Sequence, residues 1–486
     1  MIITHALTGS ADVADWWGPL LARGKAFDPT KFFIICLNSL GSPYGSASPL
    51  TMDHEFGERY GPEFPLCTIR DDINIHKLVL DSLGVKSVAI CIGGSMGGML
   101  ALEWLFVENG EFVKNVVALA TSAKHSAWCI SWGEAQRQCI YSDPKYDDGY
   151  YPLDDPPNSG LGAARMSAML TYRSRNSFEK KFGRASPSDD ERKKLLRKDI
   201  VQTHKNSKQE DIQRRDENSI GDVSAIDDSS HNSNEKSNNS DLNTNHSDKQ
   251  QHWSVHNDGS TRKTSFESHH TSRSNSLDSS VSFASLTIQD THSTSVSSSP
   301  LNNCTNEDGE THSTERKSRS SIDFNRQRRR PQHFFSAQNY LRYQAQKFIS
   351  RFDANCYIAI TRKLDTHDVG RDRPEFDNDT AKALQSRKQP ALIVGIQSDA
   401  LFTYSEQIFI AKNMPNSKLH KISSQEGHDA FLLEFKEIND LIIAFENENL
   451  KEIMTSKGNN EEWTQEQLEE GKKESVFGEA EDVANW

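Results

Sequence analysis

The sequence predicts an α/β protein with a mostly parallel sheet that is covered by helices on both faces. Three observations predict this fold class. Short runs of β-branched and other apolar residues alternate along the chain with segments of helical periodicity. These runs are continuously apolar, which is typical of strands buried on both faces. A glycine-rich turn at residues 93–97 joins one such run directly to an apolar helix, and a succession of this kind builds parallel strands through helical crossovers.

Four short apolar runs predict the strands of the first part of the sheet domain, which we assign to residues 1–142. The runs are residues 1–3, 32–37, 87–92 and 116–120. Between the second and third runs, apolar side chains recur at helical spacing over 69–83. Gly84 is placed to end that helix, because glycine readily adopts the left-handed conformation of a helix C-terminus. A second apolar helix is expected at 97–107.

Amphipathic helical segments rich in Trp, Met and Tyr follow, and we assign residues 143–376 to a helical lid inserted into the sheet domain. Within the lid, residues 186–332 are dominated by Ser, Asn, Asp, His and Lys and contain few large apolar side chains. Such a segment cannot bury enough apolar surface to offset the entropy of ordering, which predicts a long disordered loop. Helical character returns at 337–360.

The sheet resumes in residues 377–446, the second part of the sheet domain. An apolar run predicts a buried strand at 391–396, a shorter strand is expected at 418–422, and a closing helix is expected at 429–445. From residue 447 to residue 486 the sequence is acidic and predicts a loose C-terminal tail.

Composition narrows the classes of protein to consider. The net charge is −13, from 56 basic and 69 acidic residues, which argues against a nucleic-acid or membrane-surface partner. The seven cysteines are scattered and include no CxxC pair, so they predict reduced thiols and neither a zinc site nor a disulfide framework. The start lacks the features of a signal peptide, and no apolar run approaches the roughly 20 residues of a membrane span. We therefore expect a cytoplasmic protein.

The glycine-rich turn carries the strongest chemical signal. Gly93 and Gly97 flank Ser95 in a G-x-S-x-G pattern that lies between a strand and a helix. Glycines at these positions allow the sharp turn that presents a nucleophilic serine in the α/β-hydrolase fold. The alternative is a glycine-rich turn that contains a serine by chance. The flanking elements favour Ser95 as a nucleophile.

A serine nucleophile needs a base and an acid that orients the base. In this fold the acid and the histidine follow later strands in that order. Asp399 comes after the strand at 391–396, and His428 comes after the strand at 418–422. The alternatives are an aspartate that caps a helix or turn and a histidine of a surface loop. The sequence predicts a Ser95, Asp399 and His428 triad.

Two backbone N–H groups are expected to stabilise an oxyanion. Met96 would lie at the N-terminus of the helix after Ser95, where an unpaired amide and the helix dipole favour negative charge. The loop at 5–9 follows the first strand and would supply the second donor through the N–H of Leu7. A plain turn is the alternative for that loop.

Four segments together resemble homoserine O-acetyltransferases in their fungal form. They are His-Ala-Leu-Thr-Gly-Ser at 5–10, Leu-Asn-Ser-Leu-Gly-Ser at 37–42, Gly-Gly-Ser-Met-Gly-Gly at 93–98 and Glu-Gly-His-Asp-Ala-Phe at 426–431. The resemblance covers nearly all of the chain outside the Ser-rich insert. It implies a two-step covalent mechanism without metal or prosthetic group. Ser95 would take an acetyl group from acetyl-CoA and pass it to L-homoserine, giving O-acetyl-L-homoserine for methionine biosynthesis.

The resemblance also implies roles for three further residues and a possible homodimer. Arg165 would bind the carboxylate of the amino acid, with Tyr172 nearby, and Asp429 would bind its amine. A guanidinium suits the first role because it pairs bidentately with a carboxylate. Without the resemblance, Arg165 would be interpreted as a cation on a helix surface. Asp429 could instead, or in addition, cap the closing helix.

The chain departs from the family pattern in two places. Family members usually carry several dozen residues before the first matching segment, including the first strands of the sheet, so we expect that this chain is truncated at its N-terminus. The Ser-rich insert exceeds that of bacterial relatives and is expected to be dispensable for the chemistry.

Three other functions remain open from the sequence. The first is a serine esterase of the same fold. The second is the same transfer with succinyl-CoA as donor or serine as acceptor. The third is a non-catalytic scaffold whose Ser-rich loop recruits partners after phosphorylation.

Overall fold

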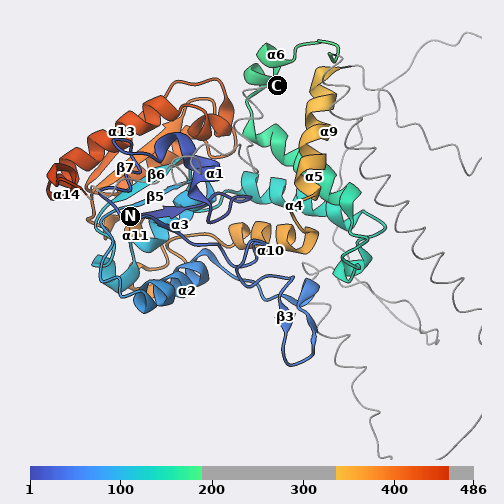
Figure 1. The fold of residues 1–486 in the computed structure, drawn as a ribbon, viewed down its shortest axis with the longest axis horizontal. Coiled ribbons are helices and arrows are strands. Elements are labelled where there is room, and N and C mark those ends of the chain that lie inside the picture. Colours follow the sequence, from blue (N-terminus) through green and yellow to red (C-terminus); the bar gives the residue numbers. More distant parts are fainter. Residues whose placement is uncertain (189–334, 459–486) are drawn as a thin grey trace, which may run out of the picture. The chain divides into compact units, whose positions relative to one another are not determined.

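The computed structural model describes residues 1–188 and 335–458 (Figure 1). The predicted disordered loop at 186–332 lies outside the described residues except for its first three positions. The larger part of the predicted C-terminal tail, residues 459–486, also lies outside them.

A parallel sheet of six strands forms the centre of the sheet domain, in the order β2-β1-β5-β6-β7-β8. Its strands are β1 (Ile2–Thr4), β2 (Ile35–Cys36), β5 (Cys91–Gly94), β6 (Val116–Leu119), β7 (Ala391–Ile396) and β8 (Ser417–Ile422). All five pairings are parallel. The predicted fold class, a mostly parallel sheet with helices on both faces, is confirmed.

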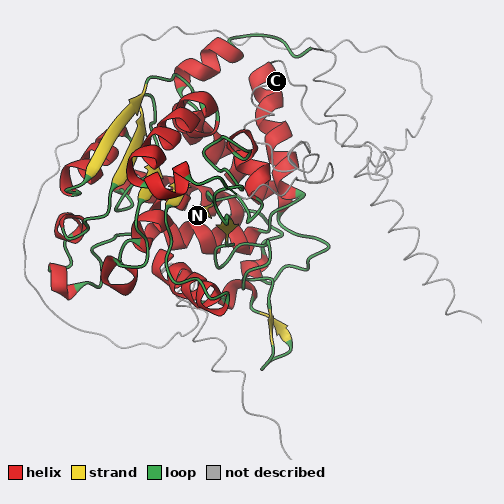
Figure 2. Ribbon diagram, turned by 60° about the vertical axis from the view of Figure 1, so that its left-hand side comes forward, coloured by secondary structure: helices red, strands yellow, loops and turns green. Residues whose placement is uncertain are grey.

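Alternate side chains of the central strands β6 and β7 enter different cores, which is why these two strands are continuously apolar. Val116 and Ala118 of β6 belong to the core on one face, and Val117 and Leu119 belong to the core on the other. The helices that contribute to the first core include α2 (Ile69–Ser82), α3 (Met96–Trp104) and α12 (Tyr404–Asn413). Those of the second core are α1 (Val13–Trp17) and α13 (Phe435–Asn449). Figure 2 shows the yellow strands among these red helices.

The lid consists of helices that the chain inserts between β6 and β7. They are α4 (Ala127–Tyr141), α5 (Asn158–Tyr172), α6 (Arg175–Lys181), α9 (Ser336–Ile349) and α10 (Ala354–Asp365). Helix α5 packs against both α4 and α9, and α10 packs against α4. Helix α4 precedes the predicted lid boundary at residue 142, yet it packs with the lid helices (Figure 1).

Shorter elements complete the described chain. They are the hairpin of β3 (Met52–Asp53) and β4 (Glu58–Arg59), the helices α11 (Thr380–Gln385) and α14 (Lys451–Thr455), and the 3-10 helices η1 (Gly18–Leu20), η2 (Gly61–Glu63), η3 (Val107–Gly110), η4 (Asp147–Gly149), η5 (Pro374–Phe376) and η6 (Gly427–Leu432). No helix in the described parts of the chain is both long and apolar enough to cross a membrane.

The structure corrects several predicted element boundaries, and the strand predicted at 87–92 is observed as β5 at Cys91–Gly94. The closing helix predicted at 429–445 is interrupted, because residues 427–432 form the 3-10 helix η6 and α13 begins only at Phe435. The helix predicted at 337–360 is two helices, since Asp353 caps a new one with a side-chain hydrogen bond to the N–H of Cys356. The predicted tail begins too early, because α13 runs to Asn449 and α14 follows it.

A buried ion pair connects the lid to the sheet domain. Lys363 of α10 donates hydrogen bonds to both carboxylate oxygens of Asp72 on α2, at 2.7 and 2.6 Å, and to the carbonyl of Leu40 at 2.7 Å. The side chains of Lys363 and Asp72 are 1% and 0% exposed. Removing one partner of such a pair leaves an uncompensated charge in the protein interior.

We expect Lys363→Met to lower the free energy of unfolding by about 3–5 kcal/mol, because the Asp72 carboxylate would stay buried without its cation. Chemical denaturation measures this change. The matched control is Lys418→Met, which removes the exposed pair with Glu448 and is expected to cost less than about 1 kcal/mol. Equal losses in the two variants would contradict the prediction.

Candidate active site

Ser95 occupies a strained turn between β5 and α3. Its backbone has φ +59° and ψ −126°, a conformation that non-glycine residues rarely adopt and that is concentrated at functional sites. Two hydrogen bonds hold it: the Ser95 N–H donates to the carbonyl of Leu119 at 3.0 Å, and the Thr121 hydroxyl donates to the Ser95 carbonyl at 2.7 Å. The neighbouring strand β6 and the residues directly after it therefore fix the turn that presents the hydroxyl.

The glycines of the motif are required by the close approach of β1. A Cβ atom at Gly97 would lie 2.2 Å from the backbone oxygen of Thr4, and one at Gly93 would lie 2.1 Å from the Thr4 hydroxyl. The Thr4 hydroxyl instead donates a hydrogen bond to the Gly97 carbonyl at 2.6 Å. The motif thus brings the end of β1, and the loop that follows it, against the nucleophile turn.

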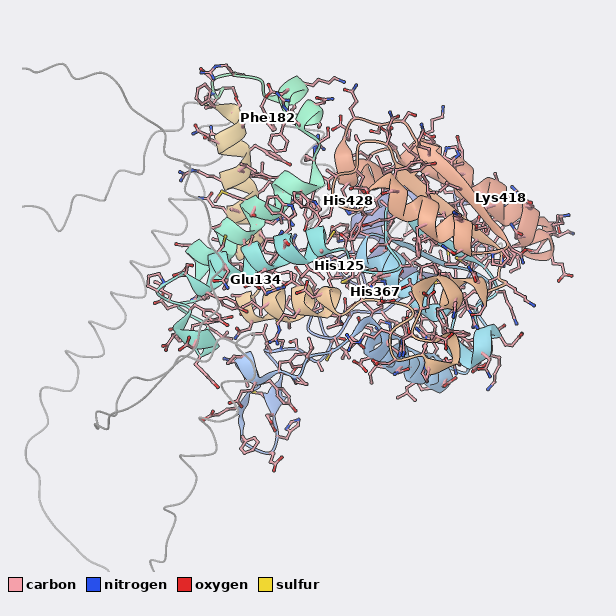
Figure 3. The ribbon with its side chains drawn as sticks, turned by 180° about the vertical axis from the view of Figure 1, so that it is seen from behind. His125, Glu134, Phe182, His367, Lys418 and His428 are labelled. Carbon is pink, nitrogen blue, oxygen red and sulfur yellow. The ribbon has the colours of Figure 1, made fainter. Side chains whose placement is uncertain are left out.

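The structure brings together the three side chains predicted to form a triad. His428 Nε2 lies 2.9 Å from Ser95 Oγ, and His428 Nδ1 lies 2.7 Å from Asp399 Oδ2. All three residues are buried, with exposed fractions of 8% for Ser95, 5% for Asp399 and 3% for His428. Figure 3 shows His428 between the lid helices and the strands of the second part of the sheet domain. The alternative of a surface-loop histidine is wrong for His428.

Asp399 serves both the turn and the histidine. Its Oδ1 accepts hydrogen bonds from the N–H groups of Leu401 and Phe402, at 2.8 and 3.0 Å, while Oδ2 faces the imidazole of His428. The turn-aspartate alternative and the triad arrangement therefore hold together. Fixed in this way, the carboxylate orients the ring so that Nδ1 carries the proton and Nε2 faces Ser95.

Several charges tune the imidazole of His428. Burial is the largest single influence and lowers the pKa of His428. The Asp399 carboxylate and its hydrogen bond act in the opposite direction, as do the charges of Asp429 and Glu406. The net result is a pKa raised above the ordinary value of 6.5. Aromatic rings of Tyr172, Phe402 and Phe431 surround the imidazole, with centroids 6.0, 5.4 and 5.1 Å from its own.

The candidate oxyanion donors lie on adjacent elements. Met96 is the first residue of α3, so helix geometry leaves its N–H without an intrahelical acceptor. Leu7 lies in a turn closed by the hydrogen bond from Gly9 N–H to the Ala6 carbonyl at 3.0 Å. We call residues 5–9 the oxyanion loop. It follows β1, which is the sheet neighbour of the strand that leads to Ser95.

The side chain of His5 connects the oxyanion loop to the segment that follows β2. Its Nε2 accepts a hydrogen bond from the N–H of Ser39 at 3.0 Å, so the proton is on Nδ1, which donates to the Ala6 carbonyl at 2.8 Å. Burial lowers the pKa of His5 from 6.5 to about 4. The ring is therefore neutral at physiological pH and keeps both hydrogen bonds.

Of the substrate residues expected from the resemblance, Tyr172 and Asp429 adjoin His428, and Arg165 lies against the ring of Tyr172. Arg165 on α5 is 0% exposed, so the alternative of a helix-surface cation is wrong. Its guanidinium carbon lies 5.5 Å from the ring centroid of Tyr172 and 5.0 Å from that of Phe348. The Tyr172 ring in turn faces His428. Asp429 directly follows His428 on η6 and is not the N-cap of the closing helix, which is Glu434.

Sequence reasoning missed Glu406, which lies in the first turn of α12. Burial and then the charge of Asp399 raise the pKa of Glu406 from 4.5 to about 7, and Glu406 contributes to the raised pKa of His428. The available signal was a glutamate in the first turn of the helix that follows Asp399, and glutamates are common at helix starts.

A parallel sheet, a strained serine on a strand-to-helix turn and an Asp399-His428-Ser95 hydrogen-bond chain define a protein of the α/β-hydrolase class. A family model for the alpha/beta hydrolase fold matches residues 1–265. The homoserine O-acetyltransferase of Saccharomyces cerevisiae is 52% identical over 486 residues, which cover 100% of this chain and 86% of the relative. The chain belongs to the homoserine O-acetyltransferase family, a family of acyltransferases, and the predicted resemblance is confirmed.

Solved structures show the same fold at lower identity. The homoserine O-acetyltransferase from Bacillus anthracis has a TM-score of 0.57 at 14% identity, over 92% of this chain and 88% of that one. Esterase E22 has a TM-score of 0.56 at 17% identity, over 91% and 88%. The fold alone therefore does not separate transfer to an acceptor from hydrolysis. The separation depends on the residues around the triad.

Proposed function

We propose that the chain transfers an acetyl group from acetyl-CoA to the side-chain hydroxyl of L-homoserine through an acetyl-Ser95 intermediate. In the first step, His428 Nε2 takes the proton of Ser95 as Oγ bonds to the thioester carbon. The N–H groups of Leu7 and Met96 stabilise the oxyanion. The carbon–sulfur bond then breaks, His428 returns its proton to the sulfur, and CoA leaves.

The second step uses the same groups in reverse. His428 takes the proton of the homoserine hydroxyl, whose oxygen bonds to the acetyl carbon. The ester bond to Ser95 breaks, and Ser95 Oγ regains a proton from His428. The product is O-acetyl-L-homoserine. The chain supplies the nucleophile, the base and the oxyanion donors, and the acetyl group arrives as an activated thioester, so we propose that no metal or prosthetic group takes part.

The buried guanidinium of Arg165 is the observation that favours transfer to homoserine over hydrolysis. A cation fully inside the protein and one aromatic ring away from the catalytic histidine suits an acceptor that brings a carboxylate. Water needs no such group. Asp429, beside the imidazole, offers a carboxylate for the acceptor's ammonium group. A homodimer and a cytoplasmic location stay predictions.

The test is CoA release from acetyl-CoA with homoserine, serine and water as competing acceptors. We expect release to depend on homoserine and O-acetyl-L-homoserine to accumulate in equal amount. Release that is indifferent to homoserine would favour an esterase. A stronger response to serine, or to succinyl-CoA in place of acetyl-CoA, would assign the same chemistry to other substrates.

Arg165→Met is expected to lower kcat/KM for homoserine by about 10²- to 10³-fold, because a buried charge pair with the acceptor carboxylate is lost. Arg165→Lys should recover only part, since an ammonium cannot pair bidentately. The matched acceptor is 3-amino-1-propanol, which has the amine and hydroxyl without the carboxylate. Steady-state kinetics should show that Arg165→Met hardly changes transfer to it. Equal losses with both acceptors would contradict a role in carboxylate binding.

A further inference from the structure

Arg351 connects the lid to the oxyanion loop. It lies between α9 and α10, and its NH1 donates hydrogen bonds to the carbonyl of Thr8 at 3.1 Å and to the hydroxyl of Tyr44 at 2.7 Å. Thr8 is part of the oxyanion loop and directly follows Leu7. One lid side chain thus contacts the backbone of the loop that we propose as an oxyanion donor.

The position of this guanidinium is fixed by packing. Its Cζ atom lies 5.0 Å from the ring centroid of Phe348, a residue of α9 that is 1% exposed. The same ring contacts Arg165, also at 5.0 Å. Phe348 stacks on Phe352 at 4.9 Å, and Phe352 contacts Tyr44 at 5.7 Å. The aromatic cluster at the end of α9 therefore holds both the acceptor-binding arginine and Arg351.

The oxyanion loop is held from two sides. The ring of His5 connects it to the N–H of Ser39 on the sheet side, and Arg351 connects it to the lid at Thr8. A turn held at both ends has little freedom to rotate the peptide between them. An oxyanion donor needs this rigidity, because it must point in advance to where charge develops.

We propose that Arg351 is a positioning residue that sets the Leu7 N–H for catalysis through its hydrogen bond to the Thr8 carbonyl. The inference rests on the proposed function of Ser95 and the oxyanion loop. It assigns to the lid a part in the chemical step in addition to acceptor binding. A merely structural role would instead lower the melting temperature or raise the KM values, without a specific loss in the chemical step.

The test compares Arg351→Met with three further variants. Methionine keeps an unbranched apolar side chain against Phe348 but removes the donor. Arg351→Lys keeps a donor with less reach. Tyr44→Phe removes only the second acceptor. Lys347→Met removes a different cation, in the last turn of α9.

Two rates and one stability measurement decide the outcome. A fluorophosphonate labels an activated serine and places a phosphoryl oxygen in the oxyanion hole, so its labelling rate at Ser95 reports on Leu7 without either natural substrate. We expect Arg351→Met to lower both this rate and kcat by about 10- to 100-fold, with little change in either KM or in the melting temperature. Arg351→Lys should be intermediate, while Tyr44→Phe and Lys347→Met should stay near the unmodified chain.

Several results would overturn the inference. They are labelling of Arg351→Met at the unmodified rate, a change confined to the KM for homoserine, and an equal loss in Tyr44→Phe. If the methionine variant fails to fold, Arg351→Lys carries the same readouts, and a labelling rate and kcat equal to those of the unmodified chain would count against the proposal. Failure of the unmodified chain to be labelled at Ser95 would overturn the proposed function itself, which is a distinguishable result.

Discussion

Ser95→Ala is expected to abolish the acetyl-enzyme and to lower kcat/KM by about 10⁴- to 10⁶-fold, because the proposed mechanism places the acetyl group on this hydroxyl. The fold should survive. The hydrogen bonds that hold this turn use the backbone of residue 95, with Leu119 and Thr121 as partners, and alanine keeps them. Mass spectrometry after incubation with acetyl-CoA should find one added acetyl group on the unmodified chain and none on the variant.

Ser122→Ala is the matched control. Ser122 is 1% exposed, and its hydroxyl has no hydrogen-bond partner among the residues that the structure describes. Its removal should therefore leave acetylation intact. Normal CoA release by Ser95→Ala would contradict the covalent mechanism, because CoA would then leave without acetylation of Ser95.

The sequence predicted best where burial dictates the pattern. The run at 391–396 is a strand over its full predicted length, because both of its faces enter apolar cores. The run at 32–37 is equally apolar, but only Ile35 and Cys36 pair with β1, and Phe33 is 71% exposed. Apolar composition alone therefore does not determine how many residues of a run form a strand.

The triad could be anticipated because parallel strands bring the loops at their carboxyl ends to one edge of the sheet. Asp399 and His428 could be predicted from their order along the chain alone. Glu406 and Arg351 needed knowledge of side-chain direction across elements that are far apart in sequence, which spacing does not supply. The predicted start of the closing helix was wrong because residues 427–432, which include His428, form a separate 3-10 helix.

Asp399→Asn is expected to lower kcat/KM by about 10⁴-fold and to move the acidic limb of the pH profile to lower pH. The carboxamide cannot hold the tautomer that leaves Nε2 free to accept the proton of Ser95. Catalysis needs a neutral imidazole, so activity rises as pH passes through the pKa of His428. Asp399 raises that pKa, while burial lowers it. Without the carboxylate the effect of burial remains, and the limb shifts downward.

Glu406→Gln tests whether the lower rate of Asp399→Asn comes from the lost charge near the imidazole or from the lost orientation of the ring. Glu406 also raises the pKa of His428, as a smaller effect than Asp399, and it forms no hydrogen bond to the imidazole in the described part of the chain. Glu406→Gln should therefore shift the acidic limb to lower pH by less than Asp399→Asn does. It should also keep a far larger share of the plateau rate of the unmodified chain. The measurement is kcat/KM across pH for both variants. A plateau as low in Glu406→Gln as in Asp399→Asn would mean that charge near the imidazole, and not its orientation by Asp399, dominates the rate.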